Sequence, residues 1–96
     1  MLVVVTRDAQ KQLKRVPRQI LRKFEGWVVL VTEEGIEAAR KIPGYHDEPL
    51  SGDRLGQRSI RLNRSYRAIY EECQADDDES LVVEFISVEE VMNHDY

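Results

Sequence analysis

Five arginines gather in one short segment of the chain, and no acidic residue interrupts them. Guanidinium groups in such a stripe suit phosphate binding, because each offers several N–H donors that fit phosphate oxygens. The alternative is that the arginines only keep exposed strand faces in solution, and composition alone favours neither interpretation. The five residues are Arg54, Arg58, Arg61, Arg64 and Arg67.

This basic stripe belongs to a chain whose charge is unevenly distributed. A net charge of −4 over 96 residues argues against a nucleic-acid partner if the charge is spread evenly. Residues 1–72, however, hold all 14 Lys and Arg against 10 acids, a net of +4, whereas residues 73–96 hold eight acids and no Lys or Arg. A partner rich in phosphate is therefore compatible with the sequence.

Two of the arginines are predicted to face one another across a β-hairpin. Residues 58–62 and 66–71 alternate in hydrophobicity as strands do, and residues 63–65 are typical turn residues. With a three-residue turn, Arg61 lies opposite Arg67, and like charges at opposed positions destabilise a strand pair. A scissile phosphate would relieve the repulsion, and so would Glu71, Glu84 or an acid of a neighbouring loop. A two-residue turn would shift the register and weaken this argument.

Other reactive side chains give weaker signals. Cys73 follows two glutamates and precedes an acidic run, a setting that disfavours a nucleophilic thiolate. A single cysteine cannot form an internal disulfide, which fits a reducing compartment. With two histidines and one cysteine we expect no metal site, and no motif suggests a cofactor.

Hydrophobic periodicity predicts the elements that must position these residues. Residues 2–5 favour a buried strand, and apolar residues at spacings of three and four mark a helical face in which Trp27 is a core residue. Because Pro17 is tolerated only in a first turn, this face divides into helices over 8–15 and 17–32. After these helices the sequence predicts a short helical turn over 36–42 and a long polar loop over 45–56. Strands are expected over 58–62, 66–71 and 81–88, followed by a tail over 88–96 with at most one helical turn.

The order β-α-α-β-β-β predicts an α+β fold in a single domain over residues 1–96. We expect an N-terminal strand and an α-helical hairpin packed on one face of an antiparallel sheet of about four strands. No secretory signal is visible, and no apolar stretch is long enough to cross a membrane. A cytoplasmic protein with no membrane partner is therefore expected.

Motifs along most of the chain resemble the core of the RelE/ParE toxins, whose element order is the predicted one. The Tyr66-Arg67 pair and the spacing from Glu48 to Gly56 resemble the YoeB branch, and residues 56–63 are closer to the HigB-like and RelE-like branches. The resembling segments are Glu48-Pro49-Leu50, residues 56–63, residues 66–70, Ile86-Ser87-Val88 and His94-Asp95-Tyr96.

The resemblance implies the toxin of a type II toxin–antitoxin system, which cleaves messenger RNA on the ribosome without a metal until a cognate antitoxin binds it. In such toxins the ribose 2′-hydroxyl attacks the neighbouring phosphate, a reaction that needs a base, an acid and cations. By resemblance Glu48 is the base, Arg67 the cation and His94 the acid, and Tyr96 completes the catalytic set. The RNA-binding set is Arg54, Arg58, Arg61 and Arg64, of which Arg61 occupies the place of a second phosphate contact in RelE-like toxins.

The chain departs from the pattern at three places. Its tail reads His-Asp-Tyr where YoeB-like toxins end in His-Tyr. Ser59 and Ser51 stand where other branches carry basic residues, and His46 is a substitute candidate near Glu48. Two alternatives accompany the nuclease. One is a ParE-like toxin that inhibits DNA gyrase without catalytic residues, because one fold can serve both functions. The other is an inactive RNA- or ribosome-binding module.

Overall fold

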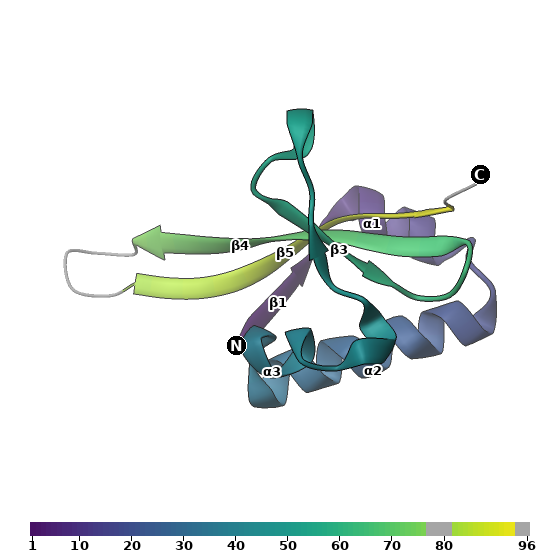
Figure 1. Ribbon diagram of the computed structural model, residues 1–96, viewed down its shortest axis with the longest axis horizontal. Helices are drawn as coiled ribbons and strands as arrows, with labels where there is room; N and C mark the ends of the chain where they lie inside the picture. Colours follow the sequence, from purple (N-terminus) through teal and green to yellow (C-terminus); the bar gives the residue numbers. More distant parts are fainter. Residues whose placement is uncertain (77–81, 94–96) are drawn as a thin grey trace.

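The computed structural model describes residues 1–76 and 82–93 of the chain. In this part of the chain five strands form one sheet in the order β1-β5-β4-β3-β2, in which β1 pairs parallel with β5 and the other pairs are antiparallel (Figure 1). The predicted α+β fold is confirmed. The elements are β1 (Leu2–Val5), α1 (Arg7–Leu13), α2 (Arg18–Glu34), α3 (Ile36–Arg40), the 3-10 turn η1 (Pro43–Tyr45), β2 (Glu48–Pro49), the 3-10 turn η2 (Gly52–Arg54), β3 (Gln57–Arg61), β4 (Tyr66–Asp76) and β5 (Val82–Asn93).

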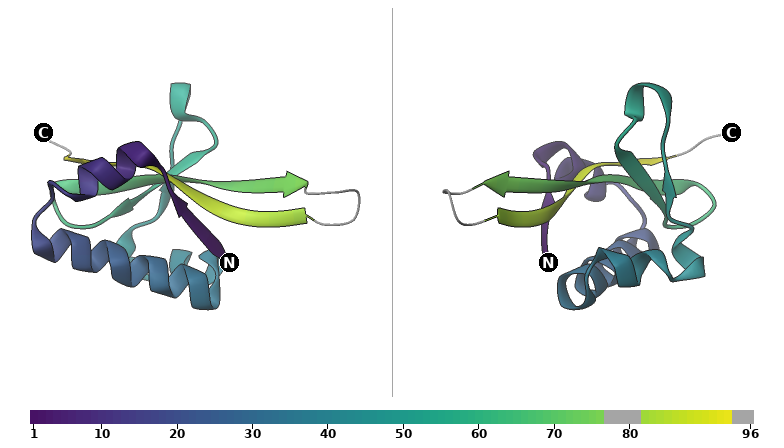
Figure 2. Two further views of the ribbon diagram at one scale, coloured as in Figure 1. Left: turned by 180° about the vertical axis from the view of Figure 1, so that it is seen from behind. Right: turned by 60° about the vertical axis from the view of Figure 1, so that its left-hand side comes forward.

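Helix α2 covers one face of the sheet and supplies much of the core. Trp27 is fully buried, as predicted, and its ring centroid lies 5.3 Å from that of Tyr70 on β4. Helices α2 and α3 lie on the same side of the sheet, and the segment that contains η2 projects from the other side (Figure 2). The predicted helices agree with α1 and α2 to within one or two residues. Pro17 lies just before α2, where its missing N–H costs no helical hydrogen bond.

The hairpin between β3 and β4 has the predicted three-residue turn. The amide of Leu62 donates to the carbonyl of Tyr66 at 2.9 Å, which closes the loop around residues 63–65. The Asn63 side-chain oxygen accepts from the amides of Ser65 and Tyr66 at 2.7 and 2.8 Å, so the turn is stabilised from within. Arg61 is consequently the register partner of Arg67, which confirms the predicted pairing.

Helix α1 lies against the edge of β5, so only α2 of the predicted helical hairpin covers the face. Strand β1 pairs with β5 from Phe85 to Val88, and α1 packs against β5 as well. There the side-chain oxygen of Gln12 accepts a 2.6 Å hydrogen bond from the amide of Val91. Gln12 thus supplies the hydrogen-bond acceptor that a carbonyl of a neighbouring strand would otherwise provide at this edge of the sheet.

Replacing Gln12 by alanine is expected to lower the free energy of unfolding by about 1–3 kcal/mol, because the buried amide of Val91 loses its acceptor. The measurement is urea denaturation at equilibrium. The control is Gln19→Ala, an exposed change on α2, which we expect to alter stability by no more than about 0.5 kcal/mol. Equal effects of the two substitutions would show that Gln12 does not stabilise the sheet edge.

Two predictions about local structure were wrong. Residues 88–93 are not a tail, because β5 continues to Asn93. Val88 and Val91 have the three-residue spacing of a helix face, yet they pair with Tyr70 and Ala68, which lie on the same face of β4. A bulge opposite Ile69 and Tyr70 inserts one extra residue into β5 and allows this spacing in a strand. The polar segment 45–56 is also not simply a loop, because it contains the short strand β2 and the turn η2.

Candidate active site

Side-chain alternation along β3 and β4 places one group of polar residues on the face opposite α2. Ile60 and Ala68 belong to the core beneath α2, so Arg61 and Arg67, which adjoin them in sequence, point to the other face. Glu48 on β2 joins the two arginines at this end of the sheet. We name this group the open-face cluster, and its members are His46, Glu48, Arg61 and Arg67.

Glu48 and Arg67 form the central contact of the open-face cluster. Arg67 Nη1 lies 2.9 Å from Glu48 Oε1, with the arginine side chain 16% exposed and the glutamate side chain 42% exposed. The hydrogen bond from Arg67 holds the pKa of Glu48 below its ordinary value of 4.5, and the charges of His46 and Arg61 act in the same direction. His46 Nε2 lies 3.6 Å from the other carboxylate oxygen. Glu48 is therefore an ionised carboxylate at neutral pH, next to two arginines.

The repulsion expected between Arg61 and Arg67 is relieved by a loop acid. The sequence left open whether an anion, Glu71, Glu84 or an acid of a neighbouring loop would do this, and Glu48 is the acid that contacts Arg67. Arg61 is exposed beside this pair on the open face. The arrangement places an ionised carboxylate next to exposed cationic groups, so the same surface can accept a proton from a hydroxyl and bind a nearby phosphate.

The remaining predicted arginines are divided between the two faces. Arg64 is exposed at the tip of the hairpin turn. Arg54 is exposed on η2, where its Nη1 donates to Gln57 Oε1 at 3.2 Å. Arg58, by contrast, is the register partner of Tyr70 and lies on the face that α2 and α3 cover. The structure therefore does not bring Arg58 together with the open-face cluster.

His94 and Tyr96, the other two predicted catalytic residues, lie outside the described residues. The described part of β5 ends at Asn93, which is the register partner of Tyr66. The preceding residue, Met92, pairs with Arg67. The described backbone of β5 thus ends one residue beyond the register partner of Arg67.

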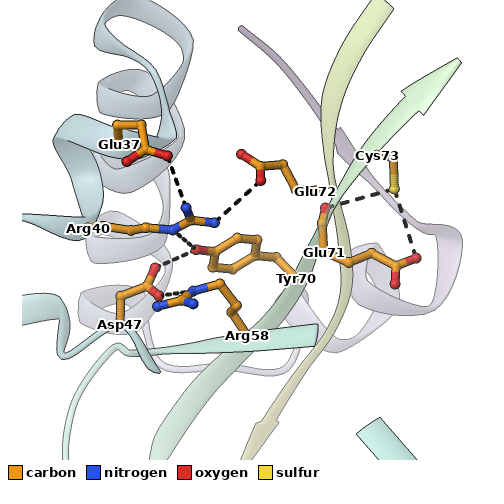
Figure 3. Close-up of polar contacts among 8 residues, drawn as sticks. All are labelled: Glu37, Arg40, Asp47, Arg58, Tyr70, Glu71, Glu72 and Cys73. Atoms are coloured by element: carbon orange, nitrogen blue, oxygen red, sulfur yellow. Dashed lines mark hydrogen bonds and ion pairs between the residues drawn. The ribbon is translucent and has the colours of Figure 1, made fainter. Parts of the chain in front are cut away.

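A second polar group, which the sequence analysis missed, lies on the opposite face (Figure 3). The Asp47 side chain is 1% exposed, and its Oδ1 accepts from Arg58 Nε at 2.6 Å. The hydroxyl of Tyr70 donates to Asp47 Oδ2 at 2.5 Å and accepts from Arg40 Nε at 3.3 Å. Burial and the Asp47 carboxylate raise the pKa of Tyr70, so its hydroxyl stays protonated and can donate. We name this group the Asp47 anchor, and its members are Asp47, Arg58, Tyr70 and Arg40.

The alternation of β3 contained a signal for the Asp47 anchor. Arg58 is two residues before Ile60, so a strand that buries Ile60 must turn Arg58 to the same side. A partly buried arginine favours a carboxylate partner, and Asp47, which directly precedes Glu48, is the acid that contacts Arg58. Ser59 is also fully buried, and among the described residues its hydroxyl has no hydrogen-bond partner. Because serine is uncharged, this position supplies no cation to the cluster.

Neither a metal site nor a membrane-spanning helix is found in the described part of the chain. Residues 1–76 and 82–93 contain no group of three or more His, Cys, Asp or Glu side chains placed to hold a metal ion. None of the helices in this part of the chain is long and apolar enough to cross a membrane.

Comparison with known proteins relates the fold to bacterial toxins. No family model matches the chain, and no curated protein matches it. Among solved structures, the YoeB/ParE toxin from Agrobacterium tumefaciens is 20% identical, with a TM-score of 0.67 over 98% of this chain and 99% of that one. YafQ from E. coli gives a TM-score of 0.68 at 15% identity, over 95% of this chain and 90% of that one. YafQ in the E. coli DinJ–YafQ toxin–antitoxin complex gives 0.67 at 17% identity, over 96% and 90%. The chain has the fold of these toxins.

Proposed function

We propose that this chain is the toxin of a type II toxin–antitoxin system and that it cleaves messenger RNA on the ribosome without a metal. The observation that carries the proposal is the contact between Glu48 and Arg67 on the open face. Glu48 and Arg67 are the two residues to which the resemblance assigns the base and the cation, and their contact supports a shared role. The fold shared with YoeB and YafQ supports the same conclusion.

The proposed reaction is an attack within the RNA strand. Glu48 takes the proton of the ribose 2′-hydroxyl, and the 2′-oxygen forms a bond to the adjacent phosphorus. The bond from phosphorus to the 5′-oxygen breaks, and His94 gives that oxygen a proton. The products are a 2′,3′-cyclic phosphate and a free 5′-hydroxyl. Arg67 and Arg61 stabilise the charge that develops on the phosphate oxygens, and Tyr96 is placed in the same catalytic set.

The contact between Glu48 and Arg67 suggests an order of events in which phosphate binding precedes proton transfer. In the free protein Arg67 holds the pKa of Glu48 low, which makes the carboxylate a weak base. A phosphate that attracts the Arg67 guanidinium would weaken that contact. The pKa of Glu48 then rises, so substrate binding strengthens the base at the moment it is needed.

The arginines of the basic stripe are proposed to hold the RNA backbone. Arg54 is exposed on η2, Arg61 on β3 and Arg64 in the turn that follows β3, where they can contact successive phosphates. Arg58 is not included in this proposal, because its guanidinium is bound to Asp47 on the other face. We also propose that the protein acts in the cytoplasm, where ribosomes translate messenger RNA.

A cognate antitoxin is the proposed protein partner. The DinJ–YafQ structure is a toxin–antitoxin complex, and its toxin has the fold of this chain. An acidic or apolar segment of such a partner would cover the open-face cluster and neutralise its arginines.

A toxin that inhibits DNA gyrase is the second candidate. The matching structure from Agrobacterium tumefaciens carries both names, YoeB and ParE, so the fold is shared by the two kinds of toxin. Such a protein needs no base beside its arginines. The ionised Glu48 at 2.9 Å from Arg67 therefore favours the nuclease.

Expression of the chain without a partner is expected to arrest growth and to halt translation, because the proposed reaction destroys messages during their use. The measurement is incorporation of labelled amino acids after brief induction, beside culture density. The matched control is the Arg67→Ala variant, expressed to the same level. Normal growth and protein synthesis while soluble, folded wild-type protein accumulates would exclude the toxin function.

A further inference from the structure

Asp47 and Glu48 are adjacent residues whose side chains serve opposite faces of the sheet. Asp47 contacts Arg58 and Tyr70 on the face covered by α2 and α3. Glu48 contacts Arg67 on the open face. Because the two share a peptide bond, whatever fixes one also restricts the other.

The backbone alone holds this segment weakly. Strand β2 has two residues, and one of them, Pro49, has no N–H to give to the sheet. The amide of Leu50 adds one hydrogen bond to the carbonyl of Gln57 at 2.9 Å. Just before Asp47 the chain turns at His46, whose φ of 45° lies in the left-handed region. So short a strand needs another attachment if Glu48 is to keep one position.

The Asp47 anchor provides that attachment from two strands and a helix. Both carboxylate oxygens of Asp47 are used, one by Arg58 on β3 and one by Tyr70 on β4. Arg40 of α3 donates to Tyr70, and its guanidinium also lies 3.2 Å from Glu37 and 3.7 Å from Glu72 (Figure 3). Side chains from β3 and β4 thus bind one buried carboxylate directly, and α3 is connected to it through Tyr70.

A buried ion pair of this kind is better suited to fixing a conformation than to adding stability. Removing charges from water costs free energy that the pairing repays only in part, so apolar residues of similar size often stabilise a protein as well. The directed hydrogen bonds of the anchor instead define where the carboxylate of Asp47 can lie.

We propose that the Asp47 anchor positions Glu48 against Arg67, so that Asp47, Arg58 and Tyr70 are positioning residues for the open-face cluster. The inference rests on the proposed function for its catalytic consequence, because Glu48 is the base of that reaction. The positioning itself can be measured in the free protein, without RNA.

The test compares two variants by the titration of the Glu48 carboxyl, followed by its carbon-13 chemical shift in NMR. Tyr70→Phe removes one hydrogen bond to Asp47 and keeps the ring that packs on Trp27. Asp47→Asn removes the carboxylate and keeps its size. The control is Glu37→Gln, which alters the outer side of Arg40 and leaves Asp47 untouched. A thermal unfolding curve establishes that each variant is folded at the temperature of the titration.

The direction of the change distinguishes positioning from simple electrostatics. If Glu48 loses its place beside Arg67, its pKa rises toward the ordinary value of 4.5. Neutralising Asp47 without moving Glu48 has the opposite effect, because a nearby negative charge disappears while Arg67, Arg61 and His46 still face the carboxyl. Tyr70→Phe changes no charge, so a rise in that variant reports movement alone.

We expect the pKa of Glu48 to rise in both variants and to stay at the wild-type value in Glu37→Gln. In the nuclease reaction, kcat should fall about 10- to 100-fold with KM within about twofold, because RNA still binds but the base is displaced. An unchanged or lowered pKa of Glu48 in folded Asp47→Asn overturns the inference, and Tyr70→Phe decides in the same way if Asp47→Asn does not fold. Failure of the proposed function would give a different result. In that case wild-type protein cuts no RNA, whatever the pKa of Glu48 is in the variants.

Discussion

Replacing Arg67 by alanine is expected to lower the rate of messenger-RNA cleavage about 100- to 1000-fold. The guanidinium lies beside Glu48 on the open face, and in the proposed reaction it stabilises the negative charge that develops on the phosphate. Loss of Arg67 also returns the pKa of Glu48 toward its ordinary value, which makes a better base. The net effect is still a large loss, because a stronger base does not replace a missing cation. The measurement is single-turnover cleavage on ribosomes programmed with a defined message.

The matched control for Arg67→Ala is Arg64→Ala at the tip of the same hairpin. Arg64 is exposed in the turn, whereas Glu48 pairs with Ser59 on β3, so the loss of Arg64 should weaken RNA binding without a large change in the rate of bond cleavage. Both variants should remain folded, since an ion pair with a half-exposed partner such as Glu48 contributes little to stability. Equal single-turnover rates for Arg67→Ala and wild-type protein would remove Arg67 from the site.

Replacing Glu48 by glutamine is expected to lower the cleavage rate about 100- to 10,000-fold, because glutamine cannot accept the proton of the 2′-hydroxyl. Glutamine keeps the size of the side chain and can still accept a hydrogen bond from Arg67, so the open-face cluster should retain its shape. Since Arg67 holds the pKa of Glu48 low, wild-type protein should keep this base ionised throughout the pH range in which ribosomes are stable. The rate should therefore not fall between about pH 7 and pH 6 through protonation of Glu48 in the free protein.

A tail deletion tests the acid that should act with Glu48. Removing residues 94–96 takes away His94 and Tyr96, and terminal residues seldom hold a core together. The rate should fall while the unfolding curve stays close to that of wild-type protein.

The control for Glu48→Gln is Asp53→Asn, an exposed change on η2 that also removes a carboxylate near the basic stripe. Full activity of Glu48→Gln would contradict the assignment of the base, and full activity after the deletion would remove both tail residues from the site.

Local sequence patterns predicted the elements in which apolar residues recur at a regular spacing or in which the turn residues are typical. The spacing of apolar residues through Trp27 predicted the helices, and the Asn63 turn predicted the register of Arg61 with Arg67. They failed in β5, where a bulge inserts one residue and interrupts the period of two that a strand normally shows. They also failed at β2, because a two-residue strand that contains a proline has no period to detect.

The candidate site was predictable only in part, for a similar reason. Periodicity placed Arg61 beside Arg67, but only the resemblance to a toxin family connected Glu48 with Arg67, which is 19 positions later in the chain. Composition counted Arg58 with the other arginines of the stripe, although strand alternation turns it to the opposite face. Its partner Asp47 is buried by contacts with β3 and β4 that come together only in the folded chain. Sequence composition cannot distinguish such an acid from the exposed acids around it.

The most direct test of the account is an RNA assay with purified protein and ribosomes programmed with one defined message, in the presence of a metal chelator. The nuclease assignment predicts cuts within the ribosome-bound codon, each with a 5′-hydroxyl end and a 2′,3′-cyclic phosphate on its upstream fragment. A gyrase supercoiling assay on the same preparation should show no inhibition. Uncut messages together with inhibited supercoiling would contradict the account and identify the protein as a gyrase toxin.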